Sequence, residues 1–288
     1  MKAIYKRELK SYFYSMIGCV FVAFLIAFTG IYFMAYNLNY GYPYFAYVLS
    51  TLTFMYLIAI PILTMRSFAE EQKNKTDQLL LTAPVSLTKV VMGKYLAMVT
   101  VLAIPCVIYL IFPLIIKAQG TAYILVDYLS ILMFFLLGCV FIAIGMFVSS
   151  LTQSQILAAI GTFGILIVLY LWTGILDFIP TTASVNAIGI VLICSFVILG
   201  IWKMTNNWFL SVALEGVCMI ATIIIYVVKS TLFEGILVDW LGQLDLISIF
   251  NSIVSNNLFD LGGVVLYLTM IVLFNFLTIQ MIQKRRWS

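Results

Sequence analysis

Long apolar runs alternate with short polar joints along the whole chain. A helix needs about 20 residues to cross roughly 30 Å of hydrocarbon, so runs of that length with few charges predict membrane-spanning helices. Eight such runs are present: Met16–Tyr36, Tyr44–Met65, Tyr95–Ile116, Tyr128–Val148, Ile156–Leu176, Val185–Trp202, Trp208–Val228 and Gly262–Ile282. The runs are continuously apolar and do not alternate over about ten residues, so they indicate helices and not barrel strands. The predicted fold class is an all-α, polytopic transmembrane helical bundle of about eight spans.

Composition supports this prediction and excludes other classes. Hydrophobic residues make up 64% of the 288 positions and charged residues 9%, against about 45–50% and 25% in soluble domains. A soluble domain, a disordered chain, a secreted disulfide scaffold and a nucleic-acid-binding protein are therefore all excluded.

The basic residues predict how the chain is oriented. With the N-terminus in the cytoplasm, 13 of the 15 lysines and arginines lie on the inner side, and only Lys117 and Lys229 lie outside. This satisfies the positive-inside rule. Both termini are basic and are expected on the cytoplasmic side, which requires an even number of spans. Eight spans meet that condition, and so do six if the hairpin 185–228 does not insert.

Two segments outside the spans have a pattern of their own. Residues 1–15 predict a short amphipathic helix at the inner interface, because Met1, Tyr5, Leu9 and Tyr12 share one arc beside three lysines. A basic tail that only fixes orientation is the alternative. Residues 16–288 then form one transmembrane domain, within which the extracellular segment 229–261 has apolar spacing typical of short helices in the outer interface.

The sequence offers no catalytic site. It contains no histidine, which removes the commonest general base and zinc ligand. The pair Gly93-Lys94 lacks the leading glycine and the following hydroxyl of a phosphate-binding loop. We therefore predict no catalytic, cofactor-binding or metal-binding residues.

The densest polar segment is residues 66–86 on the inner side. Asn74 or Thr76 can cap a short helix that Pro84 ends, and this helix carries three adjacent leucines, Leu79, Leu80 and Leu81. Exposed apolar residues of this kind need a partner to cover them. The alternative is that they lie against the membrane or against the protein's own helices.

Three carboxylates stand within or beside the spans. Glu215 lies inside the seventh run, where a charge costs a few kcal/mol, so it is expected to face a cavity or a partner. It is a candidate intramembrane substrate or proton site. Pairing with Lys203 or a neighbouring serine or asparagine, or protonation near the interface, is the structural alternative. Asp127 and Asp177 are predicted to be solvated carboxylates at outer helix ends.

A family resemblance rests on this inner polar segment, on the fourth span and its exit, and on the last span. The segment resembles the signature around the coupling helix of ABC-2-type transporter permeases, especially the subgroup that includes gliding-motility-associated permeases. The residues are Arg66, Glu70-Glu71, Thr76, Leu79-Leu80, Thr82, Pro84-Val85-Ser86 and Gly93-Lys94. The stretches Gly138, Gly145, Ser149–Gln153 and Asp260-Leu261, Tyr267, Lys284–Trp287 are similar too.

The resemblance implies a permease subunit of an ATP-driven ABC exporter in the bacterial plasma membrane. It implies a six-span core plus an inserted hairpin, a second permease subunit in a homo- or heterodimer, and a separate ATPase subunit, with an auxiliary extracellular subunit as a further candidate partner. It also implies a cytoplasmic coupling loop, residues 66–92, called the coupling segment below. The residues implied for ATPase coupling are Glu70, Glu71, Thr76, Leu79, Leu80, Leu81 and Pro84. The alternatives are a secondary transporter working alone through Glu215 and a membrane anchor of a force-transmitting complex.

Overall fold

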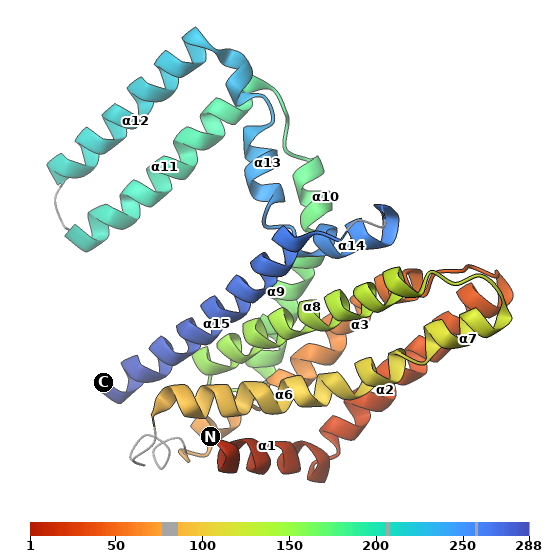
Figure 1. Cartoon of the computed structure of the whole chain (residues 1–288). Helices are drawn as coiled ribbons and strands as arrows, with labels where there is room; N and C mark the ends of the chain where they lie inside the picture. Colours follow the sequence, from red (N-terminus) through yellow and green to blue (C-terminus); the bar gives the residue numbers. More distant parts are fainter. Residues whose placement is uncertain (77–85, 206–207, 257–258, 288) are drawn as a thin grey trace. The chain divides into compact units, whose positions relative to one another are not determined.

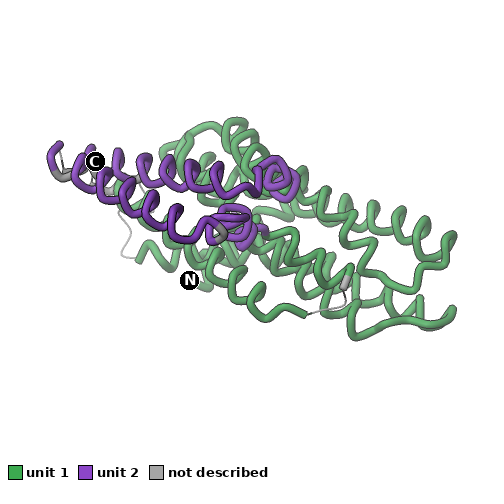
Figure 2. Tube along the Cα trace, turned by 90° about the horizontal axis from the view of Figure 1, so that it is seen from above, with its two compact units in different colours: residues 1–170, 246–288 green, residues 171–245 purple. Residues whose placement is uncertain are grey.

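The computed structural model describes residues 1–76, 86–205, 208–256 and 259–287, and the regular elements within these ranges are all helical (Figure 1). The chain divides into two compact units, residues 1–170 with 246–288, and residues 171–245 (Figure 2). Their helices are as follows. Unit 1 contains α1 (Lys2–Tyr14), α2 (Ile17–Phe33), the π-helical turn η1 (Met34–Asn39), α3 (Ala46–Thr64), α4 (Ala69–Lys73), α6 (Leu87–Tyr109), α7 (Phe112–Gln119), α8 (Ile124–Leu151), α9 (Gln155–Tyr170), α14 (Leu246–Asn256) and α15 (Leu261–Trp287). Unit 2 contains α10 (Trp172–Asp177), α11 (Ala183–Thr205), α12 (Trp208–Val228), the 3₁₀ turn η2 (Ser230–Phe233) and α13 (Ile236–Gly242).

The helices confirm the predicted multi-pass bundle. Within the described residues, seven helices are long and apolar enough to cross a membrane, and eight if α13 and α14 together count as one broken span. The predicted extracellular segment does contain short helices, η2, α13 and α14. Their location in the outer interface stays a prediction.

The fifth predicted span, Ile156–Leu176, is not one continuous helix. Helix α9 ends at Tyr170, Leu171 leaves helical geometry, and α10 begins at Trp172. Hydrogen bonds within unit 2 explain the break. The indole Nε1 of Trp172 donates to the carbonyl of Leu241 (2.9 Å), and the Thr173 hydroxyl donates to Asp245 Oδ2 (2.6 Å).

Helix α8 is the centre of unit 1, where it contacts α3, α6, α9, α14 and α15. Aromatic stacking contributes, since the rings of Tyr56 and Phe134 lie 4.3 Å apart. A glycine lets α3 approach α8 closely. A Cβ on Gly145 would overlap the Thr64 hydroxyl and lie 2.9 Å from Thr64 Cβ, so the two helices can approach this closely only because the side chain is absent.

Asp127 differs from its prediction as a solvated carboxylate, because it is fully buried at the start of α8. Its Oδ1 accepts hydrogen bonds from the backbone N–H groups of Phe45 (2.8 Å) and Ala46 (3.2 Å). The first N–H groups of a helix have no partner within it, and Asp127 supplies one for the start of α3. These hydrogen bonds also bring the first residues of α3 and α8 to the same level. Asp177 is exposed, as expected.

The N-terminal helix α1 lies along α6. The hydroxyls of Tyr5 and Thr100 are 3.0 Å apart, Tyr12 is buried, and Ile4 packs closely over Gly93. Two tyrosines of the predicted membrane-facing arc therefore contact the protein itself. The three lysines of α1 are exposed, which leaves an interfacial location as a prediction.

Candidate functional site

The base of the coupling segment is held by the end of α8. After α3 ends, the chain turns into α4, and Ser149 of α8 fixes this turn. The Ser149 hydroxyl accepts from the backbone N–H groups of Phe68 (3.2 Å) and Ala69 (3.1 Å) and donates to the carbonyl of Met65 (3.1 Å). The next residue of α8 adds a fourth bond, since its carbonyl accepts from Gln72 Nε2 (3.1 Å). Ser149 stands near the end of a largely apolar helix, and its hydroxyl binds the backbone of the neighbouring segment, whereas the Ser150 hydroxyl donates to the carbonyl of Phe147 in its own helix (2.6 Å).

A buried lysine joins three segments beside this turn. Lys94 lies in the third turn of α6, and its side chain is 3% exposed. Its ammonium group donates to Glu71 of α4 (2.8 Å), to the carbonyl of Ser67 (2.8 Å) and to Glu8 of α1 (3.3 Å). It also lies 5.2 Å from the centre of the Phe68 ring. An ammonium group has three donors, and all three are used here.

Arg7 of α1 completes the group. It donates to Glu8 (2.7 Å) and to Glu71 (3.2 Å). The hydrogen bond to Glu8 is the largest cause that raises the pKa of Arg7 above its ordinary value. Arg7, Glu8, Glu71 and Lys94 are called the anchor network below, and they tie α1, α4 and α6 together. A second pair stands next to it, in which Arg66 contacts both oxygens of Glu70 (2.6 and 2.9 Å).

The structure describes three of the seven predicted coupling residues, and Leu79, Leu80, Leu81 and Pro84 lie outside the described residues. Glu70 and Glu71, which the resemblance implied for ATPase coupling, have basic partners within this chain. Thr76 closes the end of α4, because its N–H donates to the carbonyl of Glu71 (2.9 Å).

Sequence reasoning assigned no role to Glu8, Lys94 or Ser149, although Lys94 and Ser149 stand among the residues that carry the family resemblance. One signal was available for Lys94. It interrupts the apolar sequence of α6, and a lysine inside an apolar helix is rarely buried without a carboxylate partner. The pattern did not say which carboxylate, since the partners stand 23 and 86 positions away.

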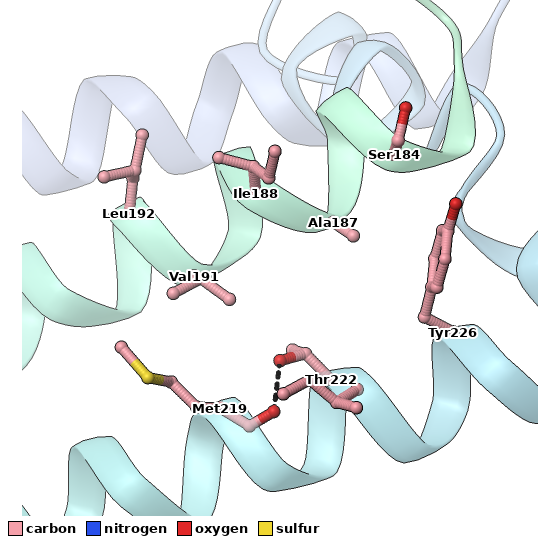
Figure 3. Close-up of a pocket in the computed structure, with 9 residues that line it drawn as sticks. Ser184, Ala187, Ile188, Val191, Leu192, Met219, Thr222 and Tyr226 are labelled. Atoms are coloured by element: carbon pink, nitrogen blue, oxygen red, sulfur yellow. Dashed lines mark hydrogen bonds between the residues drawn. The ribbon is translucent and has the colours of Figure 1, made fainter.

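Nothing in the described ranges forms a metal centre, as they contain no group of three or more Cys, Asp or Glu residues able to hold an ion. A cavity of about 430 Å³ lies between α11 and α12 of unit 2 (Figure 3). Its lining is almost entirely apolar, and its polar groups are the hydroxyls of Ser184, Thr222 and Tyr226.

Comparison with known families decides the class of protein. Residues 2–213 match the family described as ABC-2 family transporter protein. The chain belongs to the ABC-2 transporter family. Searches found no match among curated proteins and none among solved structures. Membership identifies a multi-pass membrane permease component of an ABC transporter, a class that is generally non-enzymatic and generally works with an ATPase subunit. The resemblance to the gliding-motility subgroup stays a prediction.

Glu215 of this ABC-2 protein lies two positions beyond the matched range, on α12. Its Oε1 accepts a hydrogen bond from the Ser195 hydroxyl of α11 (2.9 Å). The contact is the serine pairing that we weighed as the structural alternative, and it gives the carboxyl group a polar partner between two apolar helices. A substrate or proton role for Glu215 remains untested.

Proposed function

We propose that this ABC-2 protein is the permease subunit of an ATP-driven exporter, and that its coupling segment, residues 66–92, binds a separate ATPase subunit. The single observation that carries the proposal is Lys94, which holds the base of that segment. An exposed segment that only linked two spans would need no buried ion pairs beneath it. Burial of charged groups is costly unless they are paired, so the paired charges indicate that the position of this base matters.

The contacts supply a mechanical path for the coupling. A force applied to the segment reaches α4, and from there α6 and α1 through the anchor network and α8 through Ser149. Glu70 and Glu71 hold the base within the chain, and the leucines Leu79, Leu80 and Leu81 provide the apolar surface for the partner. Packed elements shift as units, so a small displacement at the segment changes the arrangement of several spans together.

The remaining parts of the proposal concern topology and partners. The placement of the basic residues supports cytoplasmic termini and a cytoplasmic coupling segment in the bacterial plasma membrane. The proposed assembly is a dimer of permease subunits, identical or different, with two ATPase subunits and room for an auxiliary extracellular subunit. Within it, residues 1–15 form an interfacial helix and 16–288 form the permease domain.

A co-purification experiment tests the proposal. The chain is purified from native membranes in mild detergent, and the proteins retained with it are identified by mass spectrometry. We expect an ATPase with a phosphate-binding loop. Replacing Leu79 and Leu80 by Asp should release that ATPase while the chain still inserts. Leu125→Asp is the matched control, because Leu125 is an exposed leucine in the first turn of α8, far along the chain from the segment. Retention of the ATPase by the double variant would contradict the proposal.

The same preparation separates the proposal from its two alternatives. A secondary transporter would carry solute across liposomes on an ion gradient with no other protein present, and Glu215→Gln would abolish that activity. A force-transmitting anchor would bind the ATPase but would move no solute in reconstituted complexes.

A further inference from the structure

Helix α14 has its polar side on the outside of unit 1, which is unusual for a helix beside lipid. Its apolar side packs inward, with five buried residues: Leu246, Ile247, Phe250, Ile253 and Val254. The other side carries Ser248, Asn251, Ser252 and Ser255, of which Asn251 and Ser255 are exposed. A helix facing hydrocarbon shows the opposite arrangement, because lipid offers polar groups no hydrogen bonds.

Two contacts give the depth of α14 below the outer ends of α3 and α8, which the Asp127 cap brings to one level. The Ser50 hydroxyl donates to Asn251 Oδ1 (3.0 Å), and Ser50 lies four residues into α3, about 6 Å along it. The rings of Phe250 and Phe134 are 6.0 Å apart, and Phe134 lies seven residues beyond Asp127, about 10 Å along α8. In the predicted orientation, in which α3 and α8 start at the outer surface, Asn251 is therefore an exposed amide at the depth of the outer leaflet.

The exposed part of α3 continues this surface. Most of α3 is buried, but Tyr47, Phe54, Ile58 and Ile62 are between 40% and 44% exposed. Together with Thr51 these residues recur every three or four positions and so share one helix face, the α3 stripe. The Phe54 ring meets Tyr170 of α9 edge to face at 5.7 Å. The surface is therefore polar near its outer end and aromatic, then aliphatic, further in.

We propose that the α3 stripe and the polar side of α14 form one wall of the translocation path, and that the cargo bound there is an amphiphile whose polar part is uncharged. The assignment rests on the proposed export function. The exposed side-chain amide of Asn251 needs water or a polar ligand at this depth, and a path supplies both. The hydroxyls of Ser252 and Ser255 donate to carbonyls of their own helix (2.7 and 2.9 Å) and keep lone pairs that can accept from such a ligand.

The chemistry of the wall selects the cargo. Neither α3 nor α14 contains a single Asp, Glu, Lys or Arg. A strongly charged head group or an inorganic ion would lose its hydration here without gaining an opposite charge. A hydroxyl or amide group would find donors and acceptors in Ser50, Asn251 and Ser255, and a hydrocarbon tail would lie along Phe54 and Ile58.

Thiol labelling tests the wall without any ATPase. The five native cysteines are replaced by alanine, and single cysteines are introduced as Asn251→Cys, Ser255→Cys and Val265→Cys. Val265 is the matched control, since it is 60% exposed and lies four residues into α15 on an apolar surface. A membrane-impermeant maleimide is added outside intact cells. We expect labelling at 251 and 255 at least tenfold faster than at 265. Equal labelling rates at positions 251 and 265, or no labelling at position 251, would contradict the assignment of this surface to the translocation path.

A second measurement tests the cargo in the complete complex in proteoliposomes. A monoacylglycerol and an alkyl sulfate of equal chain length are compared as stimulators of ATP hydrolysis. We expect stimulation by the monoacylglycerol, with its half-maximal concentration raised about fivefold by Asn251→Leu, the effect of losing one hydrogen bond. Equal stimulation by the alkyl sulfate, or no effect of Asn251→Leu, would overturn the cargo assignment.

Co-purification and thiol labelling together distinguish a failure of the proposed function from a failure of the path wall. If no ATPase accompanies the chain, the proposed function fails at the co-purification step, before any cargo is compared. If the ATPase co-purifies but positions 251 and 255 are not labelled faster than position 265, the proposed export function still stands and the assignment of the path wall is wrong.

Discussion

Lys94→Met removes the charge at the centre of the anchor network while keeping a long side chain in its place. The carboxylates of Glu8 and Glu71 and the carbonyl of Ser67 would each lose a hydrogen bond from the ammonium group. Breaking a buried ion pair by removing one partner costs about 3–5 kcal/mol. Glu8 and Glu71 are 13% and 18% exposed and keep Arg7, so we expect the lower end, about 3 kcal/mol.

The loss is measurable in detergent by a thermal assay that follows reaction of the buried thiols Cys106 and Cys139 with a fluorogenic maleimide. Lys89→Met is the matched control, because Lys89 stands in the first turn of the same helix and is exposed. We expect an apparent melting temperature several degrees lower for Lys94→Met and no change for Lys89→Met.

A double variant tests the reason for the loss. Adding Glu71→Gln to Lys94→Met removes one of the two carboxylates left without the ammonium group, so part of the stability should return. If Lys94→Met has the same apparent melting temperature as the unaltered protein, the anchor network does not hold the base of the coupling segment. The same conclusion follows if adding Glu71→Gln lowers that temperature further.

Three further changes have defined outcomes. Asp127→Ala should cost about 1–2 kcal/mol in the same thermal assay because α3 loses its cap, Asp127→Asn should retain most of the stability, and Asp177→Ala should change nothing. Gly145→Ala should destabilise by about 1–3 kcal/mol through overlap between α3 and α8, whereas Gly164→Ala, with nothing within 4 Å of the added methyl group, should be neutral. Glu215→Gln keeps an acceptor for its serine partner, so ATP-driven transport by the reconstituted complex should be unchanged; a large loss would assign Glu215 a role in transport.

The helices could be predicted from the sequence because each one is specified locally. Continuous apolar runs fix where a chain crosses a membrane, although α6 begins at Leu87, before the predicted run Tyr95–Ile116. The break at Leu171 could not be predicted, because the run Tyr170-Leu171-Trp172 is as apolar as its neighbours. Its cause is the set of hydrogen bonds that α10 makes with residues about 70 positions further on.

The candidate site was predictable only in part for a related reason. The charges of the coupling segment are visible in the sequence, but their partners are fixed by tertiary packing. Glu71 could equally have faced an ATPase, and Asp127 has the sequence context of a solvated helix end. In both cases the deciding atoms, Lys94 Nζ and the N–H groups at the start of α3, belong to distant segments.

The anchor network holds two cations and two carboxylates, and the neighbouring Arg66 and Glu70 are also matched one to one. Its formal charge is zero when all its members are ionised. Carrying one elementary charge through a membrane potential changes the energy by about 2.3 kcal/mol per 100 mV, whereas a neutral body moved along the membrane normal does no such work. A stroke that displaced this group as a unit would therefore need the same energy in an energised cell and in a depolarised one.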